Sequence, residues 1–417
     1  MTTRQMLVIA DDLTGAADAG APLAGAGLTT DLVLDAAYLD GRALDGRAHC
    51  AVMVVDTDSR DLTGDDARRA VRDAARRLAA DRFPILVKKV DSLLRGPIAA
   101  ELTGLLDVVP DALVVFAPAL PAAGRTTVDG VQRIRGTALH HTSMWAAEHR
   151  RPADAIAPHL APLPVARLGR HEIRGTGAAA ALAASTAAVV VCDAETDADL
   201  DAIVRAGLAS GRRICWAGTA GLTAAFARHL RPVRESATVA FPARGSFLAV
   251  IGSADPAAAE QVDELRAGGA GLVDLPATVL RGEPSARTLL AAAVRRTASQ
   301  GDTVVRVTGP VDPARRRAVA DGLAGVVAPA AAGASLLVLT GGATARRVLT
   351  AIGVADLRLR GEPEPGVGYA EDPATGRLVL TKAGSFGDPH TLTRAIATIR
   401  KTTRHTHQPL TREEHPA

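Results

Sequence analysis

Short runs of apolar, mostly β-branched residues alternate along this chain with longer stretches in which alanine, leucine and arginine recur at helical spacing. Such runs are typical of buried parallel strands, and the stretches between them are typical of helices that cover a sheet. We therefore expect an α/β protein with two domains, each a mainly parallel sheet flanked by helices. The predicted strands are Met6–Ala10, Ala51–Val55, Ile85–Val90, Ala112–Phe116, Ala188–Cys192 and Arg213–Trp216, followed by Phe247–Ile251, Val304–Val307, Leu336–Leu339 and Leu378–Thr381.

The alternation breaks around Leu230–Arg244, where prolines and charged residues interrupt it, and a fresh apolar run begins afterwards. This break predicts a linker between a first domain, residues 1–235, and a second, residues 243–400. Residues 401–417 are rich in His, Thr and Pro, which predicts a flexible tail.

Composition narrows the class of protein. Of the 417 residues, 47% are apolar and 22% charged, which excludes disorder over most of the length. The net charge is only +3, acids and bases are interspersed, and aromatic residues make up 2%, so a nucleic-acid partner is not expected. Arginine-rich stretches such as Arg68–Arg77 are typical of a solvated helix face.

Neither a targeting segment nor a metal-binding pattern is visible. The chain reaches Asp11 after a short apolar run, without the core of a signal peptide, and no run is long enough to span a membrane. The three cysteines, Cys50, Cys192 and Cys215, lie far apart in no metal-ligand spacing. We expect a soluble cytoplasmic protein without a protein-built metal site.

Polar residues gather where the predicted strands of the first domain end, which is where open α/β sheets bind ligands. Two adjacent carboxylates follow the first strand; they repel each other and only one can cap the next helix, so the other should meet a cation or a hydroxyl. Lysine and arginine after later strands suit an anionic substrate. The residues singled out are Asp11, Asp12, Ser59, Arg60, Lys89, Asp91 and Arg95. A further acid, Asp193, is predicted to cap a helix.

The predicted strands of the second domain end instead in glycines and small hydroxyls. Glycine lets backbone approach a ligand closely, and a helix N-terminus presents free N–H groups to phosphate. Four such turns in one domain favour a nucleotide site, although neither a P-loop nor a credible dinucleotide fingerprint is present. The turns are Gly252-Ser253, Thr308-Gly309-Pro310, Thr340–Ala345 and Lys382–Gly387.

These stretches together resemble the four-carbon acid sugar kinase family, in which a sugar-acid domain precedes a nucleotide-binding domain. The resemblance rests on Ala10–Ala16, Asp58-Ser59-Arg60, Lys88–Gly96 with Glu101, Ala117-Pro118-Ala119 with Gly124-Arg125, Gly252-Ser253, Thr340–Ala345 and Lys382–Gly387. It implies that Ser59, Arg60, Lys89, Asp91 and Arg95 bind a tetronate-type acid. It also implies that Ser253, Gly341, Gly342, Ala343, Thr344 and Gly384 bind ATP. Ala343 departs from the family, which often has an acidic residue there.

The resemblance implies an ATP-dependent kinase that phosphorylates the terminal (4-) hydroxyl of a four-carbon sugar acid in carbohydrate acid catabolism. Transfer needs a carboxylate to take the hydroxyl proton; Asp12 is the first candidate, with Asp11 and Asp91 behind it. Mg²⁺ would bridge the phosphates with little protein ligation, and a hinge near Leu230–Arg244 would close the domains.

Two alternatives stay open at this point: a hydroxy-acid oxidoreductase, and a non-catalytic two-lobed sugar-acid sensor. Threonate, erythronate and 3-oxo-tetronate are equally acceptable as substrates, because one hydrogen-bonding residue can discriminate among them. A homodimer is the default assembly for such an enzyme.

Overall fold

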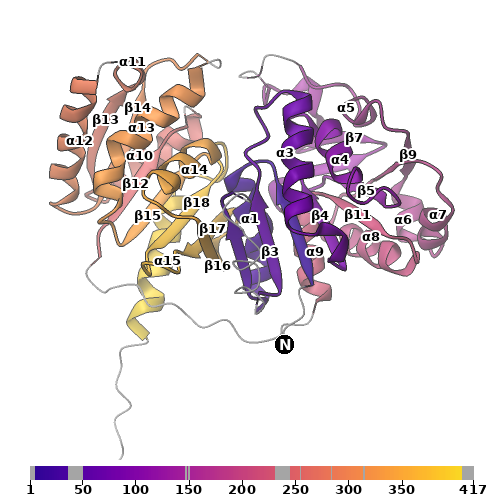
Figure 1. The fold of residues 1–417 in the computed structure, drawn as a ribbon. Coiled ribbons are helices and arrows are strands. Elements are labelled where there is room, and N and C mark those ends of the chain that lie inside the picture. Colours follow the sequence, from indigo (N-terminus) through magenta and orange to yellow (C-terminus); the bar gives the residue numbers. More distant parts are fainter. Residues whose placement is uncertain are drawn as a thin grey trace, which may run out of the picture.

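In the computed structural model, the two halves of the chain share one 15-stranded sheet (Figure 1). The structure describes residues 5–35, 50–145, 148, 151–230, 245–253, 255–282, 284–312 and 315–405. The strand order is β13-β14-β12-β15-β18-β17-β16-β2-β3-β1-β4-β11-β5-β10-β9. The predicted α/β class with mainly parallel pairing is confirmed; the joining of the two sheets was not foreseen.

Eight parallel strands form the sheet of the first half. All six predicted strands are present, and β1 matches its predicted bounds. The strands are β1 Met6–Ala10, β2 Thr30–Val33, β3 Val52–Asp56, β4 Ile85–Lys89, β5 Leu113–Ala117, β9 Val165–Leu168, β10 Val189–Cys192 and β11 Ile214–Gly218. A small antiparallel sheet, β6 Arg125–Val128, β7 Val131–Ile134 and β8 Thr137–Ala138, stands beside it.

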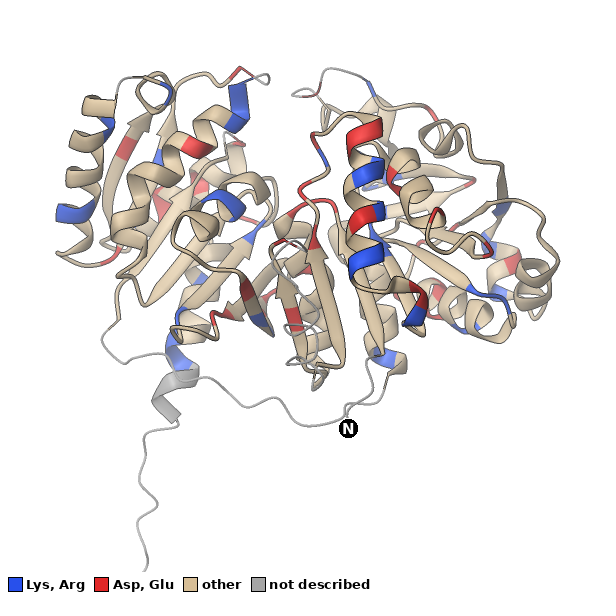
Figure 2. Ribbon diagram, in the orientation of Figure 1, with Lys and Arg blue, Asp and Glu red and all other residues tan. Residues whose placement is uncertain are grey.

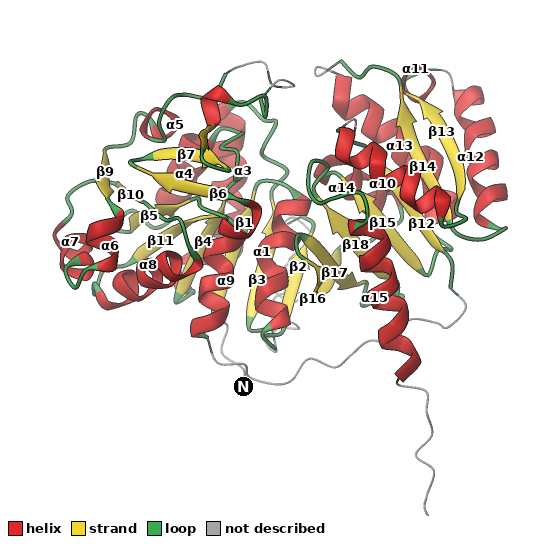
Figure 3. Ribbon diagram, turned by 180° about the vertical axis from the view of Figure 1, so that it is seen from behind, coloured by secondary structure: helices red, strands yellow, loops and turns green. Residues whose placement is uncertain are grey.

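Helices cover both faces of this half. In Figure 1, α3 Gly64–Arg77 and α4 Ile98–Leu106 lie side by side over one face. Seen from behind in Figure 3, α1 Leu13–Gly25 and α9 Ala220–His229 cover the other. The remaining helices are α5 Ala157–Leu160, α6 Arg170–Arg174, α7 Ala178–Ala184 and α8 Asp197–Ala209, with short 3₁₀ turns at Ala80–Arg82, Pro121–Ala123 and Leu139–His141. Acidic and basic residues alternate along α3 (Figure 2), as expected for the solvated Arg68–Arg77 face.

The second half continues the sheet with five parallel strands and an antiparallel pair. The strands are β12 Phe247–Ile251, β13 Gly271–Pro276, β14 Thr303–Thr308, β15 Leu336–Thr340, β16 Asp356–Glu364, β17 Val367–Glu371 and β18 Leu378–Lys382. The helices are α10 Pro256–Ala267, α11 Ala277–Leu280, α12 Pro284–Ala298, α13 Arg316–Ala331, α14 Gly342–Ala351 and α15 Thr391–His405. Residues 231–244 of the predicted linker Leu230–Arg244, and residues 406–417 of the predicted tail, lie outside the described residues.

The two halves join through β16, which pairs antiparallel with β2 of the first half. Helix α1 packs against β16 and β17, and one apolar cluster contains side chains from both halves, including Leu23 of α1 and Leu359 of β16. At the crossing Gly20 allows close packing, because a Cβ there would lie 2.3 Å from Leu359 Cδ1 and 3.0 Å from Val54 Cγ2. Helix α1 also contacts α14, the helix that follows β15.

Candidate functional site

The turn after β1 is built by its own side chains. Asp12 is the N-cap of α1: its Oδ1 accepts from the Gly15 N–H at 2.8 Å, and its Oδ2 accepts from the Thr14 hydroxyl at 3.0 Å. Gly15 has no room for a side chain, since a Cβ would lie 2.5 Å from Asp12 Oδ1 and 3.1 Å from Lys89 Nζ. The turn thus holds a carboxylate at a helix N-terminus, where its negative charge is favoured.

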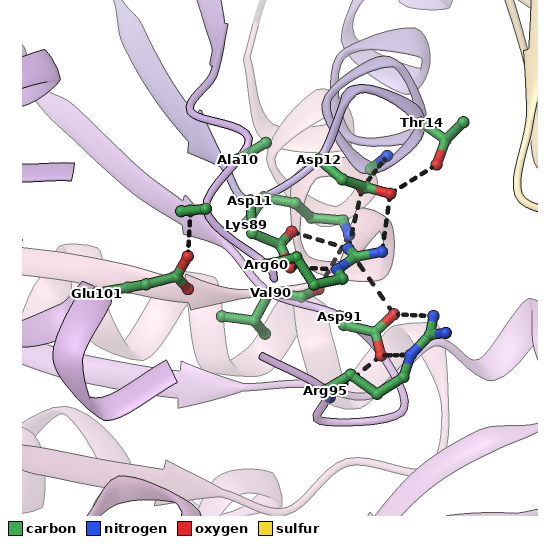
Figure 4. Close-up of polar contacts among 12 residues, drawn as sticks. Ala10, Asp11, Asp12, Thr14, Arg60, Lys89, Val90, Asp91, Arg95 and Glu101 are labelled. Carbon is green, nitrogen blue, oxygen red and sulfur yellow. Dashed lines mark hydrogen bonds and ion pairs between the residues drawn. The ribbon is translucent and has the colours of Figure 1, made fainter. Parts of the chain in front are cut away.

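Arg60 holds both carboxylates of this turn, as Figure 4 shows. Its Nε and Nη2 donate to Asp11 at 2.6 and 2.9 Å, and its Nη1 and Nη2 donate to Asp12 at 2.8 and 2.9 Å. Burial raises the pKa of Asp11, but the charges of Arg60, Lys88 and Lys89 together outweigh burial, and the net pKa is lowered. Asp12 is the more accessible acid, with 13% of its side chain exposed against 2% for Asp11.

Asp91 and Arg95 form a second ion pair beside Arg60. Arg95 donates from Nε and Nη2 to the two Asp91 oxygens at 2.7 and 3.0 Å, and Arg60 Nη2 lies 3.9 Å from Asp91 Oδ1. Burial opposes ionisation of Asp91, yet Arg95 and Arg60 together hold its pKa below the ordinary range. Asp91 is therefore a weak base that fixes two guanidinium groups in place.

Behind these groups lies a polar cluster in which Ser59, Lys88 and Glu101 are buried. The Ser59 hydroxyl donates to Glu101 and lies 2.7 Å from the Thr57 hydroxyl, and Glu101 pairs with Lys88 at 3.1 Å. Ser59 is 0% exposed, so its side chain supports the Arg60 loop from within rather than facing the open site. Sequence reasoning did not foresee this inward placement.

Lys89, Asp18 and Arg125 complete the first half of the site. Asp18 and Arg125 have no role predicted from the sequence. Lys89 is buried and its Nζ donates to the Val90 carbonyl at 2.9 Å. Asp18, one turn after Thr14 on α1, lies near Lys89 and Arg125: burial raises its pKa, and these two cations partly oppose the rise. The helical spacing from Thr14 to Asp18 is the signal that could have identified Asp18.

In the second half, α14 begins at a glycine turn. Gly341, the N-cap, has φ +94°, a conformation that glycine adopts without strain. A Cβ on Gly252 would lie 1.9 Å from Thr344 Oγ1, so the end of β12 and the first turn of α14 touch. Ala343, which precedes Thr344 in the first turn of α14, is exposed.

The loop after β18 approaches the same place. A Cβ on Gly384 would lie 2.3 Å from Ser253 Oγ, so only glycine allows the two loops to meet. Lys382 is buried beneath the loop and donates to the carbonyls of Ala383, Gly384 and Phe386 at 2.7, 3.2 and 2.8 Å. Burial lowers the pKa of Lys382 to about 8. This arrangement produces a small-residue cradle at a helix N-terminus.

The two sets of loops meet at Asp12. A Cβ on Gly342 would lie 2.2 Å from Asp12 Oδ2 and 3.1 Å from Thr14 Oγ1, so backbone of the α14 turn contacts the acid site. Arg346, one turn further along α14, bonds Asp56 at the end of β3 at 2.7 Å. The structure thus brings the predicted Asp12 of the first half into contact with the predicted Gly342 turn of the second half.

Next to this junction, a cleft of about 1050 Å³ is lined by both halves of the chain. Arg60 and Arg95 contribute from the first half, and Arg316 and Arg317 from the start of α13. The described part of the chain contains no group of three His, Cys, Asp or Glu that could hold a metal ion. None of its helices is long and apolar enough to cross a membrane.

Comparison with known proteins decides the family. Residues 6–226 match the model of a sugar-binding N-terminal domain, and residues 248–392 match that of a nucleotide-binding C-terminal domain. The chain is 33% identical over 405 residues to the D-threonate kinase of Cupriavidus necator, covering 91% of this chain and 94% of that protein. The chain belongs to the four-carbon acid sugar kinase family.

Two further comparisons extend the family likeness. A D-erythronate kinase of Heliobacterium modesticaldum is 31% identical over 241 residues, which are 54% of this chain and 53% of that protein. The crystal structure of a Salmonella typhimurium LT2 protein has the same fold, with a TM-score of 0.77 at 20% identity, and covers 94% of this chain and 98% of that chain. The protein is therefore a kinase, a phosphotransferase with an alcohol group as acceptor and a nucleotide-binding domain. The oxidoreductase and sensor alternatives are set aside.

Proposed function

We propose that this protein is an ATP-dependent kinase that phosphorylates the terminal (4-) hydroxyl of threonate, erythronate or 3-oxo-tetronate in carbohydrate acid catabolism. The observation that carries the proposal is the contact between Asp12 and the Gly342 turn. A carboxylate suited to accept a proton lies against a helix N-terminus suited to accept phosphate. Phosphoryl transfer requires these two groups side by side.

Asp12 is assigned as the base because it is the carboxylate that touches the nucleotide half. Its Oδ2 accepts from the Thr14 hydroxyl, and a substrate hydroxyl can take the place of that neutral donor. In the transfer, the bond from O4 to the γ-phosphorus forms, the bond from the γ-phosphorus to the β–γ bridging oxygen breaks, and Asp12 takes the O4 proton. Asp11 and Asp91, the other candidates, have lowered pKa values and act by positioning Arg60 and Arg95.

We expect Arg60 to lie near the negative charge that develops on the transferred phosphoryl group, and Lys89 to lie near the bound sugar acid. Arg60 touches Asp12 directly, so it steadies the base and the charge near the transferred group. Arg95 lines the cleft, and Lys89 and Asp91 lie beside Arg60. We expect these three residues to bind the sugar acid, while Ser59 supports the loop that carries Arg60.

The cradle of the second half fits the phosphates of ATP. Ser253 and Gly384 approach each other so closely that no side chain fits at Gly384, and Gly341, Gly342, Ala343 and Thr344 form the first turn of α14. Backbone N–H groups there have the polarity that phosphate needs. Mg²⁺ would bridge the nucleotide phosphates with little protein ligation, since this ion usually keeps several of its waters.

Each half of the chain binds one of the two ligands. Residues 1–235 bind the sugar acid and residues 243–400 bind the nucleotide, in line with the sugar-binding and nucleotide-binding family models that match these two parts of the chain.

The test is ADP release with Mg-ATP across D-threonate, L-threonate, D-erythronate and 3-oxo-tetronate, with aldoses and longer sugar acids as controls. We expect turnover on at least one four-carbon acid and none on aldoses. Nucleotide binding without turnover on any member of the panel would contradict the substrate class. Absence of ATP binding would contradict the kinase proposal itself.

A further inference from the structure

The cations of the acid site differ in whether they are already neutralised. Arg60 is bonded to the carboxylates of Asp11 and Asp12, and Arg95 is bonded to that of Asp91. A guanidinium that already forms such pairs has few donors left for a ligand. These two arginines therefore have fewer free donors for a substrate anion than a cation that forms no ion pair.

Lys89 and Arg125 are different. Among the described residues, neither has a carboxylate oxygen within 4.0 Å. Each makes one side-chain hydrogen bond in the described structure, Lys89 to the Val90 carbonyl and Arg125 to the Ser92 hydroxyl, so most of their donors remain available. Burial lowers the pKa of Arg125, and the charge of Asp91 only partly offsets this.

The backbone of Arg125 is fixed over the acid site. Arg125 is the first residue of β6 and exchanges two backbone hydrogen bonds with Leu120, at 2.8 and 3.1 Å. Its guanidinium reaches Ser92, the residue after Asp91. A half-buried guanidinium on a strand is pre-organised for a planar anion.

We propose that Arg125, together with Lys89, binds the substrate carboxylate and makes the enzyme select acids over neutral polyols. Arg125 offers two parallel N–H donors to the two carboxylate oxygens, and Lys89 adds a point charge. Asp18 lies near both cations without pairing with either, and its carboxylate is placed to accept from substrate hydroxyls. This assignment rests on the proposed function, since it supplies the acid-binding end of the same site.

The assignment predicts a specific pattern of binding. An Arg125→Gln variant should bind D-threonate roughly 10- to 100-fold more weakly, the loss expected for hydrogen bonds to a charged group. Arg125→Lys keeps the charge and should recover part of the affinity. Arg133→Gln is the matched control, because Arg133 lies on β7 of the same small sheet and its Nη1 donates to the Gly136 carbonyl.

Isothermal titration without nucleotide provides the test, using D-threonate, L-threonate, D-erythronate and the neutral polyol threitol. We expect wild type and Arg133→Gln to bind at least one acid more tightly than threitol, and Arg125→Gln to lose that preference. Arg125→Gln binding the acid as tightly as Arg133→Gln would overturn the assignment, and so would a wild type that binds none of the acids. Acid binding that depends on Arg125, without phosphoryl transfer, would support the assignment and contradict the kinase substrate instead.

Discussion

Replacing Gly342 by alanine tests whether the two halves meet at the reacting groups. The added Cβ would lie 2.2 Å from Asp12 Oδ2 and 2.9 Å from its Cγ, where ordinary contact begins at 3.4 Å. Either the carboxylate or the α14 turn must therefore move by roughly 1 Å, and displacements of that size cost about 100-fold in rate.

Neither partner can move freely. The Asp12 carboxylate is bonded to the Gly15 N–H and to Arg60, and α14 is tied to the first half through the bond from Arg346 to Asp56. We expect kcat of Gly342→Ala to fall about 100-fold, while the affinity for the sugar acid alone changes little.

Steady-state ADP release with the best acid measures this effect. The control is Gly325→Ala in the exposed face of α13, where an added Cβ meets nothing within 4 Å. Circular dichroism and urea unfolding establish that both variants fold. If Gly342→Ala keeps the kcat of Gly325→Ala, the contact between Asp12 and the glycine turn has no part in transfer.

Three further predictions concern the charges that hold the site together. Lys88→Met leaves the Glu101 carboxylate buried without its partner and should lower the free energy of unfolding in urea by about 3–5 kcal/mol. The double variant with Glu101→Leu should recover much of this loss, and no recovery would contradict the pairing. Because the pKa of Asp91 is held below its ordinary value, ionised Asp91 stabilises the fold at pH values above about 4, and this contribution is lost as the pH falls further. The free energy of unfolding in urea should therefore fall more steeply between pH 6 and pH 3 for wild type than for Asp91→Asn, and an equal fall would refute the lowered pKa. Arg346→Met leaves the Asp56 carboxylate, which is 0% exposed, without its guanidinium and should cost about 3 kcal/mol; an unchanged urea midpoint would show that the bond does not tie the halves together.

Much of the strand pattern was predictable because buried parallel strands are almost uniformly apolar. Met6–Ala10 and Phe247–Ile251 have their predicted bounds. Strand β16, by contrast, alternates buried and half-exposed positions and includes Arg358 and Arg360, so it lacks the continuous apolar run on which the prediction relied. The joining of the sheets depends on β16, which is why the single sheet was not foreseen.

Local rules also failed where distant segments intervene. Asp193 was predicted to cap a helix, and this is wrong: Thr196 caps α8. The Asp193 carboxylate instead accepts from the N–H groups of Asp129 and Gly130 at 2.9 Å each. That turn lies more than 60 residues earlier in the chain, so nothing near Asp193 could reveal it.

At the candidate site, the sequence could specify residue types but not their pairing. The expectation that one of the two adjacent acids caps the helix and the other meets a cation agrees with the geometry of Asp12 and Asp11. The sequence could not indicate that Arg60 bonds both acids, nor that Ser59 turns inward to Glu101. Both contacts join residues more than 40 positions apart, and they follow from packing of the loops around one sheet edge.

The position of the new phosphate in the product tests the central claim most directly. The account places the terminal hydroxyl at Asp12 and the carboxylate at Arg125, so the product should carry phosphate on O4. Proton-coupled ³¹P NMR of the product should then show a triplet, split by the pair of protons on C4. A doublet, from phosphate on a secondary hydroxyl, or an unsplit signal, from an acyl phosphate, would contradict the orientation of the substrate and the role given to Asp12.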